Sequence, residues 1–313
     1  MTTETLNSVM ETANPQLPGI DSDTRRLMLE QPYSAWHDNA GMIERIEKPS
    51  EETFERLYLD RRKPVIIEGA TRKWHAPSTW TIDYLKAKVG QKQVRVTYSP
   101  GGVYKKANYQ TMAVADFLDL ITSEQEGREN YYVTGITLEK AFPELAGDVK
   151  RPKFVDKKTN AGMSLFLGRD SITDCHFHPG EENVLAQIVG KKRVVMFSPE
   201  DFAPLYPRSF LANHYNWSRI TFDRPPDFKQ FPKFKKARVY EALLEPGDML
   251  FIPVHWWHAV YGPDLSISGA FFWQSTLKRY HFPGPGLRCC LHKYGFRRYS
   301  WLKALIPDSV LTQ

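Results

Sequence analysis

Eight short strand-like segments follow one another closely between residues 164 and 273 of this 313-residue chain. Several are rich in β-branched or aromatic residues, and Gly, Pro or Asp separates many of them. Short strands at this spacing, without helices between them, are typical of an antiparallel barrel or sandwich. We therefore expect a mainly β fold built from SLFLG, TDCHFH, NVLAQIVG, KRVVMFS, ARVYEALL, DMLFIPV, HAVYG and SISGAFFW.

The part of the chain before residue 164 mixes helical and strand-like patterns. The sequence predicts helices at residues 51–60, 78–90 and 113–124, and strands at residues 61–70, 93–99 and 130–136. Ser78 is the expected N-cap of the second helix, and Gly90 is its expected end.

The length of the chain fits one domain, because a barrel with additions can use such a length as a single core. Residues 1–35 are polar and weakly periodic, which predicts an N-terminal arm, although residues 23–31 could form a short helix. Residues 36–286 should form the barrel domain, and residues 287–313 return to a helical, basic composition. A long insertion rich in Pro and aromatic residues interrupts the barrel at about 200–235, and such loops are usually functional.

Composition narrows the class of protein. The hydrophobic content of 42% and aromatic content of 13% exclude a disordered chain. The net charge of +6 is mildly basic, and the cations mix with acids until the last third, so nucleic-acid binding is not favoured but stays open. The three cysteines, Cys175, Cys289 and Cys290, form no CxxC pair or disulfide framework. Without a signal-peptide pattern or an apolar run near membrane-spanning length, we expect a reduced, cytoplasmic protein with no membrane partner.

Three histidines suggest a metal site. His176 and His178 are two residues apart, and residues i and i+2 of a strand point to the same face. His258, in the turn PVHWWH, could supply a third ligand from a strand packed opposite. Neutral imidazole binds Fe, Zn, Cu or Ni, so the ligands alone do not identify the metal. His255, in the same turn, is expected to lie behind the ligands or face solvent.

The same residues carry a family resemblance. From about Glu51 to Trp273 the chain resembles the Jumonji-C/cupin-like oxygenases that use Fe(II), 2-oxoglutarate and O2, most closely the asparaginyl hydroxylase known as factor inhibiting hypoxia-inducible factor. The segments that carry it are NVLAQIVGKKRVVMFSPEDFAPLYP and EPGDMLFIPVHWWHAV, in the family's order and spacing, and the earlier KPVIIEGA and WTIDYL. The resemblance implies a double-stranded β-helix (a cupin or jelly-roll barrel) with flanking helices, and a homodimer formed through C-terminal helices.

The resemblance also implies roles for individual residues. His176 and His258 match the two metal histidines. Lys192 matches the strand lysine that pairs with the distal carboxylate of 2-oxoglutarate; only one of Lys191 and Lys192 can face inward, and the resemblance selects Lys192. The buried ammonium would need an anionic partner.

Four further polar residues match positions around the cosubstrate. Thr173 and Tyr132 correspond to hydroxyl groups that help to hold the same carboxylate. Asn183 and Gln187 correspond to polar barrel residues near the cosubstrate and substrate. The alternative for all four is an ordinary polar residue of the core.

The chain departs from the family pattern at two places. The family motif is HxD, whereas here the second ligand position holds His178, which leaves an Fe(II) centre with one more positive charge. Glu182 lies close to the spacing at which a cupin supplies a fourth, carboxylate ligand; the alternative is that Glu181 and Glu182 form a solvated turn. Where the family has Asn two residues before the closing Trp, this chain has Phe271, so one polar contact is in doubt.

Three functions follow from these departures. The protein could be a 2-oxoglutarate-dependent hydroxylase with an unusual three-histidine site, and retention of Lys192, Thr173 and Tyr132 favours this interpretation. It could instead be a three-histidine cupin dioxygenase that needs no 2-oxoglutarate, or an inactive metal-binding module. The substrate, a peptide or protein or a small molecule, should lie beneath the insertion, where the candidate contacts are Gln187, Trp217, Arg219 and Tyr104 or Tyr109.

Overall fold

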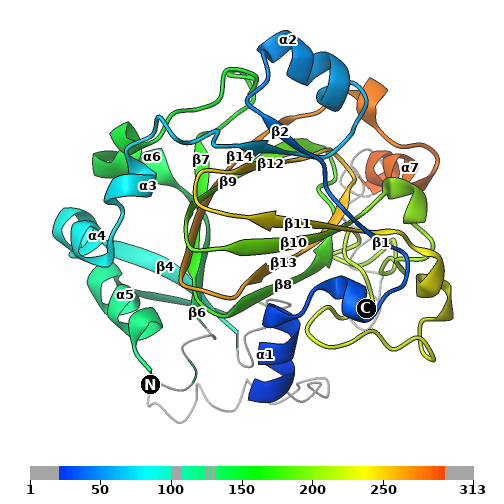
Figure 1. The fold of residues 1–313 in the computed structure, drawn as a ribbon, viewed down its shortest axis with the longest axis horizontal. Helices are drawn as coiled ribbons and strands as arrows, with labels where there is room; N and C mark the ends of the chain where they lie inside the picture. The colour runs from blue at the N-terminus through cyan, green and yellow to red at the C-terminus, as the bar shows by residue number, and fades with distance from the viewer. Residues whose placement is uncertain (1–20, 100–107, 125–126, 128–130, 293–313) are drawn as a thin grey trace, which may run out of the picture.

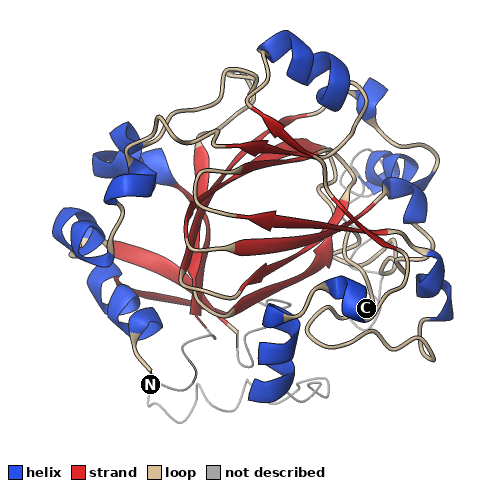
Figure 2. Ribbon diagram, in the orientation of Figure 1, coloured by secondary structure: helices blue, strands red, loops and turns tan. Residues whose placement is uncertain are grey.

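Two β-sheets pack face to face and enclose the interior of a barrel (Figure 1). The structure is a computed structural model and describes residues 21–99, 108–124, 127 and 131–292. Helices lie on the outside of the sheets and strands form the inner layer (Figure 2). The mainly β, jelly-roll fold predicted from the sequence is confirmed.

The first sheet has five strands. Their order is β1 (Ala40–Met42), β11 (Val239–Leu244), β10 (Lys192–Phe197), β13 (Trp257–Gly262) and β8 (Ser171–His176). All neighbours are antiparallel except β1 and β11, which pair in parallel. Four of these strands correspond to segments that the sequence predicts.

The second sheet has nine strands. Their order is β2 (Arg45–Glu47), β3 (Val65–Glu68), β12 (Met249–Ile252), β9 (Glu181–Val189), β14 (Ser266–Gln274), β7 (Met163–Gly168), β6 (Tyr131–Thr137), β4 (Gln93–Tyr98) and β5 (Asn108–Ala113). Only the short β2 pairs in parallel, with β3. This sheet contains the other four strands predicted after residue 163 and the three predicted before it.

The helices are short. They are α1 (Ser22–Glu30), α2 (Glu51–Phe54), α3 (Ala76–Thr79), α4 (Ile82–Val89), α5 (Val114–Thr122), α6 (Leu138–Ala141) and α7 (Gly284–Cys290). A π-turn at Glu55–Leu59 continues α2, and 3-10 turns lie at Tyr33–Ala35, Pro143–Asp148, Pro199–Asp201, Pro232–Lys236 and Leu277–Arg279. No helix in the described ranges is long and apolar enough to cross a membrane.

Side-chain alternation along the strands produces three apolar layers. The inner layer lies between the sheets and takes Leu185 of β9, Val194 and Met196 of β10, and Leu250 of β12. A second layer fills the space between the nine-stranded sheet and the helices outside it. A third covers the outer face of the five-stranded sheet. Each fully buried Leu, Ile or Phe stabilises the fold by about 1.5–3 kcal/mol, so this alternation fixes which residues face the barrel interior.

The helix predicted at residues 78–90 is divided in two. Trp80 leaves the helical conformation between α3 and α4, and the N-cap of α4 is Thr81, whose hydroxyl accepts a hydrogen bond from the Tyr84 amide at 3.1 Å. The predicted N-cap, Ser78, instead donates to the carbonyl of His75 within α3. The end at Gly90 is confirmed.

Of the two alternatives for the N-terminal segment, the short helix predicted at residues 23–31 is confirmed, since α1 and the turn after it form and pack against the five-stranded sheet. Met28 and Tyr33 are fully buried there. Glu241 accepts a hydrogen bond from the Tyr33 amide at 2.7 Å and pairs with Arg193 at 3.0 Å. Residues 1–20 lie outside the described part of the chain, as does most of the predicted C-terminal segment beyond α7.

Candidate metal centre

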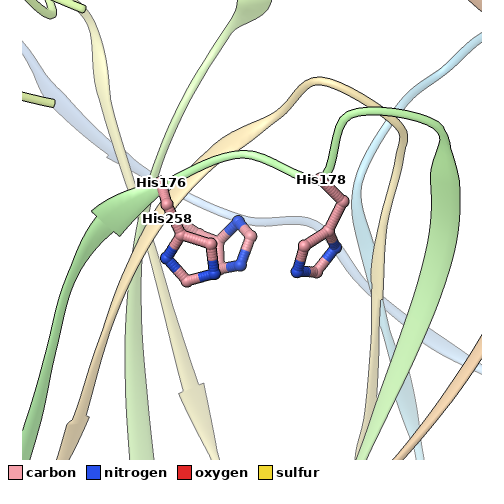
Figure 3. Close-up of side chains that lie close together, drawn as sticks. All are labelled: His176, His178 and His258. Carbon is pink, nitrogen blue, oxygen red and sulfur yellow. The ribbon is translucent and has the colours of Figure 1, made fainter. Parts of the chain in front are cut away.

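Three imidazoles converge in the barrel interior (Figure 3). His176 is the last residue of β8, His258 lies on β13, and His178 lies in the loop between β8 and β9. Their ligand nitrogens all lie within 4.8 Å of one another. Since a metal–imidazole bond is about 2.0–2.1 Å long, one ion between them could contact all three.

Hydrogen bonds orient two of the rings. Nδ1 of His176 lies 2.9 Å from the carbonyl oxygen of Asp174, and Nδ1 of His258 lies 3.0 Å from that of Trp256. Each Nδ1 therefore carries the proton and donates it, which leaves Nε2 with a lone pair for a metal. The buried Nδ1 of His178 has no hydrogen-bond partner among the described residues.

The electrostatics of the cluster suit metal binding. Burial lowers the pKa of all three histidines, and it lowers the pKa of His178 to about 3, with a smaller contribution from His176. The imidazoles are therefore neutral at physiological pH, which is the form that binds metal. The donor set fits a borderline metal such as Fe(II) or Zn(II).

His176 and His178 do not share one strand face as predicted, because β8 ends at His176. The inward face of β8 is set instead by an irregular register. His258 lies opposite His176 and Val260 lies opposite Thr173, so one extra residue of β8 sits between these pairs. This bulge brings His176 and Thr173, three residues apart, to the same side as His258 and Val260.

Glu182 is not a fourth ligand in this structure. Its Oε2 accepts a hydrogen bond from the Val254 amide at 2.8 Å, and its Oε1 accepts one from the Ser275 hydroxyl. The carboxylate is fully buried, so the alternative of a solvated turn is also wrong for this residue. Among the described residues, the metal-binding group contains histidines alone.

His255 supports the loop that carries His178. Its side chain is buried, and Nε2 lies 3.2 Å from the carbonyl oxygen of Pro179, while Nδ1 accepts a hydrogen bond from the His281 amide. The expected position behind the ligands is therefore confirmed, and the solvent-facing alternative is wrong. The residue has a positive φ of 69°, a backbone strain that this dense set of contacts offsets.

Lys192 lies in the same barrel interior, on the inward face of β10 with Val194 and Met196. It is 1% exposed, and no carboxylate of the described residues lies within ion-pair distance of its ammonium. Burial lowers the pKa of Lys192 to about 7. Its neighbour Lys191 points outward and pairs with Glu245 at 3.6 Å, so the sequence-based choice between the two lysines agrees with the structure.

Ser268 is a site residue that the sequence did not predict. Its hydroxyl accepts a hydrogen bond from the Lys192 ammonium and donates one of 2.9 Å to Oε1 of Gln187. The amide nitrogen of Gln187 is in turn held by carbonyls at the end of β9, among them that of Val189 at 2.8 Å. Gln187 therefore holds the lysine's partner in place, and its predicted contact with a substrate stays a prediction. Alternation along β14, which places Ser268 on the face of Ala270, is the signal that could have found it.

The other predicted cosubstrate residues also face inward. Tyr132 is buried beside Phe166, whose ring lies 6.0 Å from the Lys192 nitrogen. Burial raises the pKa of Tyr132, so its hydroxyl stays protonated. Asn183 shares the inward face of β9 with Leu185, and its buried Oδ1 has no hydrogen-bond partner among the described residues. These groups therefore lie on inward strand faces of the barrel that also holds the metal cluster and Lys192.

Phe271 faces away from the barrel interior. It packs in the outer layer and contacts Trp74, with ring centroids 6.2 Å apart. The inward positions of β14 are Ala270 and Phe272, and the Phe272 ring lies 5.1 Å from that of His178. Because adjacent strand residues face opposite sides, Phe272 and not Phe271 borders the metal cluster, and the predicted loss of a polar contact at Phe271 stays a prediction.

Of the predicted substrate contacts, Trp217 lies at the metal cluster. Its ring stacks on that of His176 with centroids 5.5 Å apart, and the two residues form a β-bridge. Arg219 is exposed and makes no described contact with the three histidines. Tyr109 is 55% exposed on β5, beneath Arg95. Tyr104 lies outside the described residues.

Comparisons with known proteins agree with this geometry. A family model described as a cupin-like domain matches residues 50–279, inside the barrel domain expected at 36–286. Lysine-specific demethylase 8 of Danio rerio is 34% identical over 238 residues, which cover 74% of this chain and 58% of that protein. tRNA wybutosine-synthesizing protein 5 of Homo sapiens is 29% identical over 251 residues, which cover 74% of this chain and 78% of that protein.

A third relative is Jumonji C domain-containing protein 5 of Drosophila melanogaster, 25% identical over 244 residues that cover 74% of this chain and 60% of that protein. The chain thus spans little more than half of the zebrafish and fly relatives it matches. These matches support the expected Jumonji-C and cupin-like relationship. They do not show the expected closeness to the asparaginyl hydroxylase.

Proposed function

Because the chain belongs to the cupin-like domain family, with Jumonji-C proteins among its relatives, we propose that it is an Fe(II)- and 2-oxoglutarate-dependent hydroxylase. His176, His178 and His258 would hold the metal. Lys192 would bind the distal carboxylate of 2-oxoglutarate, and Thr173, Tyr132 and Asn183 would surround it. Fe(II) with 2-oxoglutarate and O2 supplies an oxidative decarboxylation that yields succinate, CO2 and the hydroxylated product.

The observation that carries this proposal is the buried side-chain nitrogen of Lys192, which has no carboxylate partner among the described residues and lies inside the barrel that holds the three histidines. A lysine buried without an anion lowers the stability of the fold by several kcal/mol. A module that binds no anion inside the barrel would gain nothing from such a residue. A dianion that reaches from the metal to Lys192 would remove this penalty. Ser268 and Gln187 keep the ammonium in place for such a ligand.

The residues of this chain orient the reactants and exclude water. Stacking of Trp217 on His176 covers one side of the metal cluster, and Phe272 covers His178. Asn216 fixes the loop between these ligands, because its side-chain amide donates a 2.7 Å hydrogen bond to the carbonyl of Phe177. An apolar, rigid surround of this kind favours ordered binding of substrate beside the metal.

The substrate is a separate part of the proposal. Two of the relatives are named for different activities, lysine-specific demethylation and tRNA wybutosine synthesis, so the family likeness supports the reaction class and not the substrate. We propose a side chain of a peptide or protein, approaching past Trp217. Closeness to the asparaginyl hydroxylase, Fe(II) as the metal, a homodimer and a cytoplasmic location belong to the same untested proposal.

One observation favours a second candidate, a three-histidine dioxygenase that does not use 2-oxoglutarate. Within the described ranges the metal group has no carboxylate, and Glu182 is held elsewhere. Three neutral imidazoles leave Fe(II) with its full charge, which disfavours the oxidised states that 2-oxoglutarate chemistry needs. In the first candidate O2 uptake requires 2-oxoglutarate, and in the second it does not.

The test is anaerobic loading with Fe(II), followed by O2 uptake and succinate formation with and without 2-oxoglutarate. Succinate from the wild type, lost in His176→Ala and strongly reduced in Lys192→Met, supports the hydroxylase. O2 uptake that does not depend on 2-oxoglutarate or on Lys192 supports the second candidate. Succinate formed by His178→Asp but not by the wild type identifies an inactivated, metal-binding member. Lys191→Met is the matched control for Lys192→Met.

A further inference from the structure

A cavity of about 500 Å³ lies on the outer face of the nine-stranded sheet, on the opposite side of that sheet from the barrel interior. Ile67 of β3 and Met249 of β12 form part of its floor, and both belong to the outer apolar layer. The adjacent residues Ile66 and Leu250 face the barrel interior. The sheet therefore separates this outer cavity from the metal cluster; in Figure 1, β12 runs beneath α2.

The walls of the outer cavity are apolar. Trp74, 7% exposed, and the partly buried Phe154 and Ala70 stand around the floor. Three separate segments of the chain, at residues 48–51, 70–74 and 150–154, close it on its sides. A volume of this size lies within the range of cavities that hold small molecules, about 300–1,000 Å³.

The rim of the same cavity is strongly basic. The lining residues include five cations and one acid, all with exposed side chains: Lys48, Lys73, Lys150, Arg151, Lys153 and Glu51. Within the described part of the chain, only Lys153 of these cations has an ion-pair partner, Glu51 at 3.6 Å. Five lining cations from three segments outnumber the single lining acid, which produces a positive potential over an apolar floor.

We propose that this outer cavity binds a small amphipathic anion, in which an apolar ring or short chain carries a phosphate, sulfonate or carboxylate group. The apolar part would contact Trp74, Phe154 and Met249, and the charged group would lie among the rim cations. The apolar floor would bury the apolar part of such a ligand, and the positive rim would attract its charged group. The site is independent of the proposed oxygenase reaction, since the metal cluster and Lys192 face the other side of the sheet.

The structure favours a small molecule over the two larger occupants that a basic rim could attract. A membrane surface would need apolar side chains that protrude beside the cations, but the large exposed hydrophobic residues of the described chain all lie elsewhere: Leu27, Met42, Tyr109, Leu243, Leu277, Phe282, Leu287 and Leu291. A peptide could not extend the sheet here, because β3 and β12 are interior strands whose edges are already paired.

The test is a fluorescence titration of the full chain with anilinonaphthalene sulfonate, an aromatic anion, and with the neutral phenylnaphthylamine. Lys73→Glu/Lys150→Glu reverses two rim charges, and Ala70→Phe fills the cavity. Lys229→Glu/Lys236→Glu is the matched control, because both lysines are exposed and neither lines the cavity. Circular dichroism melting verifies that each variant is folded.

We expect the anion to bind one site per chain more tightly than the neutral compound. The rim variant should weaken that site by about tenfold, consistent with modest surface charge interactions, and the control by less than about twofold. Ala70→Phe should remove the site. Equal affinity of the anion for the wild type and the rim variant, or equal binding of the neutral compound, would overturn the proposal. If Ala70→Phe does not fold, the rim variant alone decides.

A parallel sedimentation experiment uses phosphatidylserine vesicles. No cosedimentation is expected from the wild type. Cosedimentation that the rim variant abolishes, without a saturable site for the soluble anion, would assign the surface to a membrane instead and overturn the proposal.

Discussion

Replacing Lys192 by methionine should stabilise the ligand-free protein at neutral pH and abolish its stabilisation by 2-oxoglutarate. Burial lowers the pKa of Lys192 from 10.5 to about 7. At pH 7.5 the lysine is therefore protonated in the unfolded chain but mostly neutral in the folded protein. Since one pKa unit corresponds to about 1.4 kcal/mol, the lysine costs the folded state about 4 kcal/mol at pH 7.5. Methionine has a similar length and carries no charge.

The penalty depends on pH in a defined direction. Well above pH 10.5 the lysine is neutral in both states and costs nothing. As the pH falls toward 7, the unfolded chain takes up the proton and the folded protein does not, so the folded protein loses stability. Below about pH 7 both states are protonated and the penalty is constant. Loss of the hydrogen bond to Ser268 offsets the gain of the variant by about 1 kcal/mol.

Urea unfolding at two pH values measures this difference. Lys192→Met should be more stable than the wild type by about 3 kcal/mol at pH 7.5 and about equal to it at pH 10. Lys191→Met, at the exposed neighbour, should change stability by less than about 1 kcal/mol at either pH. A Lys192→Met protein that is less stable than the wild type at pH 7.5, or a difference that does not vary with pH, would refute the reasoning.

The ligand arm uses the anaerobic Fe(II) protein. At 2-oxoglutarate concentrations about 100 times the dissociation constant, the wild type should gain about 2.7 kcal/mol of stability. Lys192→Met should gain little, because its buried site no longer offers a cation to the distal carboxylate. Equal ligand stabilisation of both proteins would show that Lys192 does not bind the cosubstrate.

Three further predictions follow from individual contacts. Anaerobic dialysis and metal analysis should find that His176→Ala and His258→Ala lose Fe(II) but that Glu182→Gln retains it. The reason is that one Glu182 oxygen bonds to Val254 and the other to Ser275. Loss of iron from Glu182→Gln would contradict this geometry. Ser268→Ala should raise the KM for 2-oxoglutarate several-fold with a smaller effect on kcat, and an unchanged KM would exclude Ser268 as a positioning residue for Lys192. Glu241→Ala should lower the free energy of unfolding by about 3–5 kcal/mol, because it leaves Arg193 buried without its partner. Urea unfolding measures this change. A loss below about 1 kcal/mol would show that the pair does not stabilise the fold.

The strands were predictable because each is specified locally. In β10, for example, Val194 and Met196 form an apolar row that ends at a Ser-Pro turn, and Lys192 continues that row inward. The resemblance selected Lys192 over Lys191, and alternation with this row gives the physical reason. His176 and His258 could be named as ligands because each stands at a recognisable end of a strand.

The parts that were not predictable depend on contacts between distant segments. The register change between β8 and β13 decides which face Thr173 and His176 share, and no local pattern reports it. Glu182 is bound by residues more than seventy positions away in the chain, so spacing alone made it appear to be a ligand. The packing of α1 likewise involves the distant Arg193–Glu241 pair, which bonds to the backbone of Met28 and Tyr33. The polar composition of residues 1–35 does not indicate these contacts.

The charge of the metal centre leads to a last prediction, on the exchange of His178 for the aspartate of the family motif. The aspartate places a negative charge among the metal ligands, close to where the dianionic cosubstrate would bind. At an effective dielectric of about 20, two charges 4 Å apart interact by about 4 kcal/mol, and metal charge and relaxation reduce the net effect. His178→Asp should therefore weaken 2-oxoglutarate binding by at least about tenfold in anaerobic calorimetry while raising the rate of succinate formation.

The two effects oppose each other, because the charge that repels the dianion also stabilises oxidised iron. Asn183→Ala, which removes a neutral neighbour, should weaken binding without raising the rate. Tighter 2-oxoglutarate binding by His178→Asp would show that the third imidazole does not set the charge of this site.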